Sequence, residues 1–250
     1  MPKNYFADWV MASAKYGIRF ANTHSAGDRS NHTMLKMMEE ADKQYGSGTT
    51  KGWELDHCNM VNPVDIPLAA KLGVGFSCAI TGLEGVEGSK DVADEFGEKV
   101  ADTFVSPVKT MIANGIHPSM DSVSWRALEL AISRKVNGKV WGPEERVDRA
   151  TALRMATTFA SEYILKADKL GTLESGKLAD LVVLDKDYMT IPEDEIATIQ
   201  PQMTVFDGKI VFVHSQFAQE YNLKPAGAIV STYEELKARR KPFGFSAGGG

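Results

Sequence analysis

The sequence has few cysteines, no long apolar run and no basic block, and each absence excludes a class of protein. The only cysteines among its 250 residues are Cys58 and Cys78, so a disulfide framework is excluded. Two free thiols in a reducing compartment are the simpler interpretation, and one bridge between them is the alternative. No run approaches the roughly 18 apolar residues that cross a bilayer, and the first residues lack a signal-peptide pattern. We therefore expect a cytoplasmic protein without a membrane segment.

Positive charge is sparse and scattered. The chain has 28 lysines and arginines against 33 aspartates and glutamates, which gives a formal net charge of −5 at pH 7. The clearest basic stretch is the short run at residues 239–241, near the end of the chain. A nucleic-acid partner is therefore not expected. The hydrophobic share of 43% and the charged share of 24% are typical of a globular domain with a sizeable core.

Strand and helix patterns alternate over the first part of the chain. Short apolar segments that predict strands occur at residues 18–24, 52–57, 74–80 and 116–121. Segments with helical spacing of apolar residues lie around them, at residues 5–15, 31–44, 62–73, 100–113, 125–133 and 143–163. This alternation predicts parallel βα units in an α/β fold. Only four units are visible, whereas a closed barrel of this kind needs eight.

The pattern changes after about Leu170, where helical spacing gives way to strands. Residues 179–185 predict a strand. Residues 203–213 predict a hairpin, because the Asp207-Gly208 pair at its centre suits a type I′ turn.

Three polar side chains stand directly after predicted strands: His24, His57 and Asp121. The carboxyl ends of parallel strands meet at one face of a barrel, where such residues converge. Imidazole nitrogen and carboxylate oxygen are ligands of Zn²⁺, which lowers the pKa of a bound water to about 7, and an aspartate there could shuttle its proton. The alternatives are two hydrogen-bonded structural histidines and, for Asp121, the N-cap of the helix that begins near Ser124.

Two sets of segments resemble the amidohydrolase superfamily, in the branch called amidohydrolase family 3. The first set lies in the barrel portion and comprises His24-Ser-Ala-Gly27-Asp28, Glu54-Leu-Asp-His57 and residues 62–73. The second comprises residues 146–160 and the signature Leu170-Gly-Thr-Leu-Glu-Ser-Gly-Lys-Leu-Ala-Asp-Leu-Val-Val-Leu-Asp185. The resemblance implies that His24 and His57 are metal ligands and that Asp121 is both a ligand and a proton shuttle.

The resemblance also implies an architecture. Residues 1–168 would form the second half of a TIM (β/α)8 barrel, strands 5–8 with their helices. Residues 169–215 would form C-terminal strands of a small β-sandwich. Residues 216–250 would be a tail that is partly disordered.

The sequence departs from the family pattern in three places. It contains no His-x-His pair, which the family carries on strand one, and no counterpart of the strand-four lysine. Met120 precedes Asp121 where the family commonly has serine. We therefore expect a C-terminal fragment whose metal site is incomplete, so that the isolated chain has weak or no activity.

The resulting hypothesis is a metal-dependent hydrolase that cleaves non-peptide carbon–nitrogen bonds in an amide, cyclic amide or amidine. Its expected cofactor is a divalent metal, Zn²⁺ above others, and its expected partners are a small-molecule substrate and either a second copy or the missing N-terminal half. The main alternative is a non-catalytic half-barrel that serves as a scaffold or regulatory module. A compact TIM-like enzyme with a phosphate site is disfavoured, because no glycine-rich loop precedes a helix after the last strand.

Overall fold

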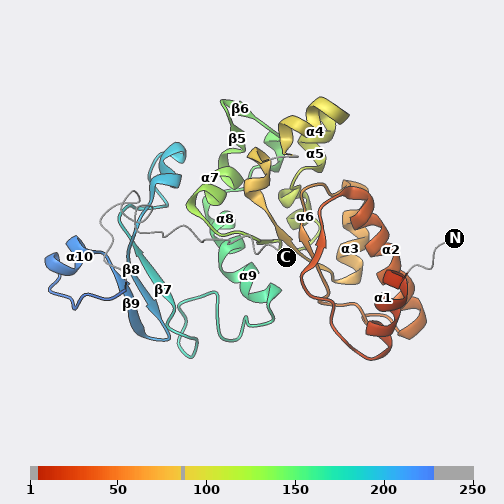
Figure 1. Cartoon of the computed structure of the whole chain (residues 1–250), viewed down its shortest axis with the longest axis horizontal. Helices are drawn as coiled ribbons and strands as arrows, with labels where there is room; N and C mark the ends of the chain where they lie inside the picture. The colour runs from red at the N-terminus through yellow and green to blue at the C-terminus, as the bar shows by residue number, and fades with distance from the viewer. Residues whose placement is uncertain (1–4, 86–87, 228–250) are drawn as a thin grey trace, which may run out of the picture. The chain divides into compact units, whose positions relative to one another are not determined.

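A computed structural model of the chain describes residues 5–85 and 88–227 (Figure 1). The described residues divide into two compact units. The larger unit comprises the residues up to Lys177 together with Tyr188–Thr198, and the smaller unit comprises Leu178–Asp187 and the residues from Ile199 onward.

The larger unit is built on a four-stranded parallel sheet with strand order β1-β2-β3-β4. Its strands are β1 (Thr23–Ser25), β2 (Glu54–His57), β3 (Gly75–Cys78) and β4 (Ser119–Met120). Each strand pairs with the next one along the chain, as successive βα units do. The predicted parallel βα arrangement is therefore confirmed, although the first and last strands are shorter than predicted.

Helices connect and cover these strands. The main helices are α1 (Tyr5–Lys15), α2 (Asp28–Tyr45), α3 (Ile66–Leu72), α4 (Ser89–Phe96), α5 (Glu98–Phe104), α6 (Val108–Ala113), α7 (Trp125–Ser133), α8 (Arg149–Ala156) and α9 (Thr158–Tyr163). Short 3₁₀ helices occur at η1 (Pro63–Asp65), η2 (Ile80–Glu84), η3 (Pro143–Glu145) and η4 (Glu193–Thr198), and a short ribbon pairs β5 (Lys135–Val136) with β6 (Lys139–Val140).

Local sequence explains where several helices begin and end. Asn62 caps η1 by accepting a hydrogen bond from the Val64 amide, and Gly73 ends α3 in the left-handed conformation, with φ 70°. The single helix expected over residues 143–163 is instead divided. Asp148 caps the start of α8, and the backbone of Thr157 leaves the helical region, with φ −129° and ψ −84°, which separates α8 from α9.

The two faces of the sheet differ in chemistry. Leu55 and Phe76 are register partners on one face and are completely buried. The other face carries Glu54 and Asp56, because side chains alternate along a strand. Figure 1 shows α1, α2 and α3 on one side of the strands and α8 and α9 on the other.

The polar face of the sheet is covered by Tyr163, the last residue of α9. Its hydroxyl donates to Asp56 Oδ1 at 2.8 Å, and its ring packs against Gly75, with Cδ2 3.5 Å from the position that a Cβ there would take. Within the described residues β1 and β4 are the edges of the sheet.

The smaller unit is an antiparallel sheet of order β7-β8-β9, formed by β7 (Leu181–Leu184), β8 (Pro201–Phe206) and β9 (Lys209–Val213). Asp207 and Gly208 link β8 to β9, and both have positive φ, 49° and 71°, as a type I′ turn requires. Part of the expected tail is ordered as α10 (Ser215–Glu220), and residues 228–250 lie outside the described residues. No described helix has both the length and the apolar character to cross a membrane.

Candidate active site

The structure brings His24, His57 and Asp121 together at the carboxyl ends of the strands. His57 Nδ1 lies 2.7 Å from Asp121 Oδ2, and the His24 and His57 rings meet edge to face with centroids 4.1 Å apart. The His57 and Asp121 side chains are each 28% exposed, so the pair can be reached from solvent. Residues 97 positions apart in sequence thus share one cluster because parallel strands end at the same edge.

The backbone of His57 explains how its ring reaches this cluster. Side chains alternate along a strand, so His57 is expected on the same face of the sheet as Leu55, the apolar face. His24 is paired with Asp56 and therefore lies on the other, polar face. Instead His57 and the next residue, Cys58, both adopt positive φ, 73° and 38°. Such conformations are uncommon for residues other than glycine and often occur at functional sites. The turn breaks the alternation and allows the His57 ring to contact His24 and Asp121.

Asp121 does not cap the following helix. The N-cap of α7 is Ser124, whose side chain accepts a hydrogen bond from the Ala127 amide at 3.1 Å. The N-cap alternative for Asp121 is therefore wrong, and its carboxylate faces His57 instead.

Cys58 and Cys78 form a disulfide beside the cluster, with a Cα–Cα distance of 4.9 Å. The expectation of two free thiols is therefore wrong. The cause is the β2–β3 register, which places His57 opposite Cys78 and so brings the next residue, Cys58, close to the same strand end. Both cysteines are completely buried.

A second polar cluster, which the sequence did not reveal, lies at the amino ends of the strands. Glu54 forms an ion pair with Arg19 and accepts a hydrogen bond from the Asn22 amide at 3.3 Å. Arg19 also donates to the carbonyl oxygens of Gly52 (2.6 Å) and Tyr163 (2.7 Å). Burial raises the pKa of Glu54 to about 7 although Arg19 lowers it, and burial also raises the pKa of Tyr163. Two carboxylates at alternate positions of one short strand, Glu54 and Asp56, were the available signal.

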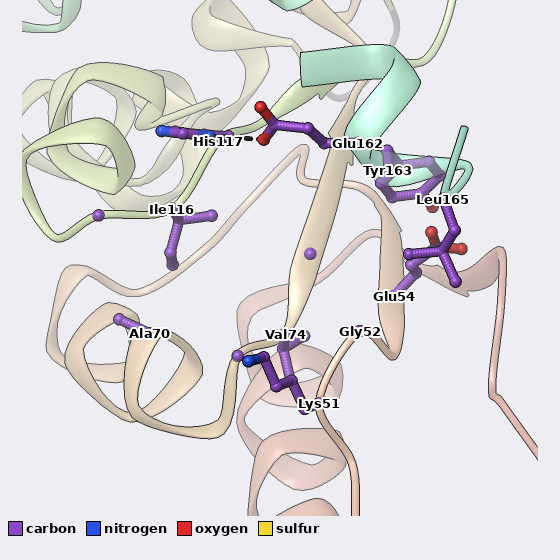
Figure 2. A pocket seen from close by; sticks show the side chains of 13 residues that line it. Lys51, Gly52, Glu54, Ala70, Val74, Ile116, His117, Glu162, Tyr163 and Leu165 are labelled. Atoms are coloured by element: carbon purple, nitrogen blue, oxygen red, sulfur yellow. Dashed lines mark hydrogen bonds and ion pairs between the residues drawn. The ribbon is translucent and has the colours of Figure 1, made fainter. Parts of the chain in front are cut away.

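A cavity of about 380 Å³ borders this second cluster and not the histidine cluster. It is lined in part by Lys51, Glu54, His117, Glu162 and Tyr163 (Figure 2). His117 pairs with Glu162 at 2.6 Å and stacks on Phe159. None of the three predicted site residues lines this cavity, so the histidine cluster and the cavity lie at opposite ends of the strands.

The three predicted residues do not make a complete metal centre. Two imidazoles and a carboxylate are chemically suited to zinc. However, among residues 5–85 and 88–227 no group of three or more histidine, cysteine, aspartate or glutamate side chains is arranged to hold a metal ion. His57 Nδ1 faces the Asp121 carboxylate instead. The cluster is an imidazole–carboxylate pair with a second imidazole against it.

The chain matches one protein-family profile and is similar in sequence to two curated proteins. Residues 1–212 match the profile of a family described as the amidohydrolase family. The chain is 26% identical over 218 residues to an N-substituted formamide deformylase from Arthrobacter pascens, a match that covers 82% of this chain and 39% of that protein. It is 28% identical over 185 residues to a 5-methylthioadenosine/S-adenosylhomocysteine deaminase from Symbiobacterium thermophilum, covering 67% of this chain and 39% of that protein.

The fold also resembles solved structures. A mutant of atrazine chlorohydrolase from Arthrobacter aurescens TC1, complexed with zinc and atraton, superposes with a TM-score of 0.57 at 18% identity. The match covers 93% of this chain and 50% of that one. The chain thus spans about two fifths of the length of the two curated relatives and half of this structure.

Proposed function

Because this chain belongs to the amidohydrolase family, we propose that it supplies the carboxyl-terminal half of the active site of a metal-dependent hydrolase. The observation that carries this proposal is the convergence of His24, His57 and Asp121, from three different strand ends, into one cluster. Each of these residue types could bind a metal or move a proton.

The proposal assigns each part of the chain a place in the family architecture. The four parallel strands correspond to strands 5–8 of a TIM barrel within residues 1–168, and the strands of residues 169–215 belong to a small β-sandwich. The metal site would be completed by the His-x-His half of the barrel, on an N-terminal half of the protein, or by pairing with another chain.

Asp121 has a defined task in this site. An ionised Asp121 carboxylate accepts a hydrogen bond from His57 Nδ1–H, which fixes the imidazole tautomer and leaves the Nε2 lone pair free for a metal. We propose that the same carboxylate accepts a proton from a water and passes it to a leaving amine. A divalent metal, which we propose to be Zn²⁺, would supply Lewis acidity and an activated water.

The proposed substrate is a small molecule with a carbon–nitrogen bond in an amide, cyclic amide or amidine. The names of the two curated relatives, a deformylase and a deaminase, support this bond type, since both denote removal of a group at such a bond. The competing proposal is a non-catalytic scaffold. It is supported by the absence of a three-ligand arrangement in the described residues.

Zinc titration of the purified chain tests the proposal. Isothermal titration calorimetry with metal analysis should show one weakly bound Zn²⁺ per chain, and His24→Ala and His57→Ala should abolish that binding. His117→Ala is the matched control, since His117 also pairs with a carboxylate but lies outside the cluster. A well-folded chain that takes up no zinc, or that loses it equally in the control variant, would favour the scaffold.

A further inference from the structure

We infer that the Cys58–Cys78 disulfide positions His57 and Asp121, which makes the two cysteines positioning residues for the proposed hydrolytic site. That the positioned residues serve hydrolysis rests on the proposed function. The positioning itself can be measured without metal or substrate. The disulfide joins β2 to β3 at the strand ends where the cluster lies.

The disulfide is connected to the backbones of both His57 and Asp121. Cys58 follows His57 in the chain, so the cross-link holds the peptide next to the imidazole. Cys78 is the register partner of His57, and its carbonyl oxygen accepts a hydrogen bond from the Asp121 amide at 3.0 Å. The Ala79 amide, one residue beyond Cys78, donates to the His57 carbonyl at 2.9 Å. The disulfide thus fixes the backbone that carries the imidazole to the end of β3, and a hydrogen bond from the Asp121 amide ties the backbone that carries the carboxylate to the same strand end.

The conformation of β2 at this point explains why a cross-link is useful. His57 and Cys58 are consecutive non-glycine residues with positive φ, a conformation that an unconstrained chain leaves readily. If β2 ended in regular extended backbone, the His57 ring would turn toward the face of Leu55 and away from His24. Fixing Cys58 to the end of β3 opposes that relaxation.

Burial indicates that the cross-link is constitutive. Both cysteines are completely buried, so a reductant in solution reaches the sulfurs only when the sheet opens. The disulfide is therefore expected to persist as a fixed part of the site in the folded chain.

The test compares the wild-type chain with the Cys58→Ala/Cys78→Ala double variant, without metal or substrate. Two measurements report on the site: the NMR ring resonances of the histidines, and hydrogen exchange at the amides of Ala79 and Asp121. In the variant we expect the His24 and His57 resonances to shift or broaden and those two amides to exchange at least about tenfold faster. The His32 and His117 resonances should not move, because each pairs with a carboxylate outside the cluster.

Asp42→Asn provides the control for a loss of stability alone. Asp42 accepts hydrogen bonds from the Gly48 and Thr50 amides in a turn outside the cluster. The inference is wrong if Asp42→Asn changes the His24 and His57 resonances as much as the double variant does. It is also wrong if the double variant folds and its resonances and exchange rates equal those of the wild type. Should the double variant not fold, the wild-type chain refolded in excess dithiol gives the same comparison with both thiols intact. A failed zinc titration would overturn the proposed function and leave this result unaffected.

Discussion

At the scale of single residues, two buried charges carry the clearest consequences. Glu54 is almost completely buried at the start of β2, and burial raises its pKa to about 7 against the opposing effect of Arg19. Arg134 is 1% exposed and donates to three carbonyl oxygens, those of Trp141 (2.6 Å), Ser106 (3.1 Å) and Val105 (2.8 Å). Ionisation of Glu54 opposes folding, whereas Arg134 supplies hydrogen bonds to backbone carbonyl groups that water cannot reach.

Glu54→Gln should remove a pH-dependent loss of stability. The folded chain holds the Glu54 proton up to about pH 7, whereas the unfolded chain releases it near 4.5. Native protein therefore binds more protons in this interval, and its free energy of unfolding falls as pH rises from 4.5 to 7, by at most about 3 kcal/mol. Urea unfolding across this range should show the variant gaining stability relative to wild type by an amount of that order. An equal pH slope in both proteins would contradict the prediction, and exposed Glu95→Gln serves as the control.

Arg134→Met should be strongly destabilising. The substitution removes the arginine donor from three buried carbonyl oxygens, of which that of Ser106 keeps the Val108 amide as a donor, so we expect the free energy of unfolding to fall by about 3–5 kcal/mol. Arg146→Met is the matched control, because Arg146 is partly exposed, donates to one carbonyl oxygen (Ile132, 2.6 Å) instead of three, and forms an ion pair with Glu193 that is worth about 1 kcal/mol or less. Chemical denaturation of both variants checks the difference. If both variants lose a similar free energy of unfolding, the buried hydrogen bonds of Arg134 contribute no more to stability than the contacts of Arg146.

At the scale of elements, the sequence predicted those features that depend on local pattern. The parallel βα units and the turn at Asp207-Gly208 were visible, because periodicity and turn chemistry are local. The Arg19–Tyr163 hydrogen bond was not visible, since it joins residues 144 positions apart. The disulfide was mistaken for two thiols for a similar reason: the proximity of the two sulfur atoms depends on strand register.

The β8–β9 hairpin offers a test of local turn chemistry. Gly208 has φ 71° and open space around it, so an added side chain meets strain without a clash. Gly208→Ala should therefore lower the free energy of unfolding of the smaller unit by about 1 kcal/mol. Gly208→Asn should lower it less, because asparagine tolerates the left-handed conformation. Thermal denaturation of the two variants distinguishes them, and equal effects would show that conformational strain is not the cause.

At the scale of the whole molecule, the four-stranded sheet of the larger unit ends in two outer strands, of which β1 carries the exposed His24 and β4 is buried. Within the described residues β1 pairs only with β2, and β4 only with β3. In a closed barrel both edges would be covered by further strands, whereas open edges are templates for pairing with another chain. The open sheet is the physical basis for the proposed association with a second copy or a complementary half.

Self-association of the chain should therefore weaken when the β1 edge is charged. Ala21 is exposed just before β1, and a lysine there opposes edge-to-edge pairing. Sedimentation velocity over a concentration series should show association of the wild-type chain and less of it for Ala21→Lys. Ala12→Lys, at an exposed position of α1, controls for added charge. A wild-type chain that stays monomeric throughout would refute the role of the edge.

The strand order of the larger unit also has a consequence for biosynthesis. Because each of its four strands neighbours the one made just before it, a nascent chain leaving the ribosome can add every new strand to a partner that has already emerged. The ribosome must release Tyr163 before Arg19 and Asp56 gain their last partner. The sheet can thus form before its polar face is covered, and the covering waits until α9 has been synthesised.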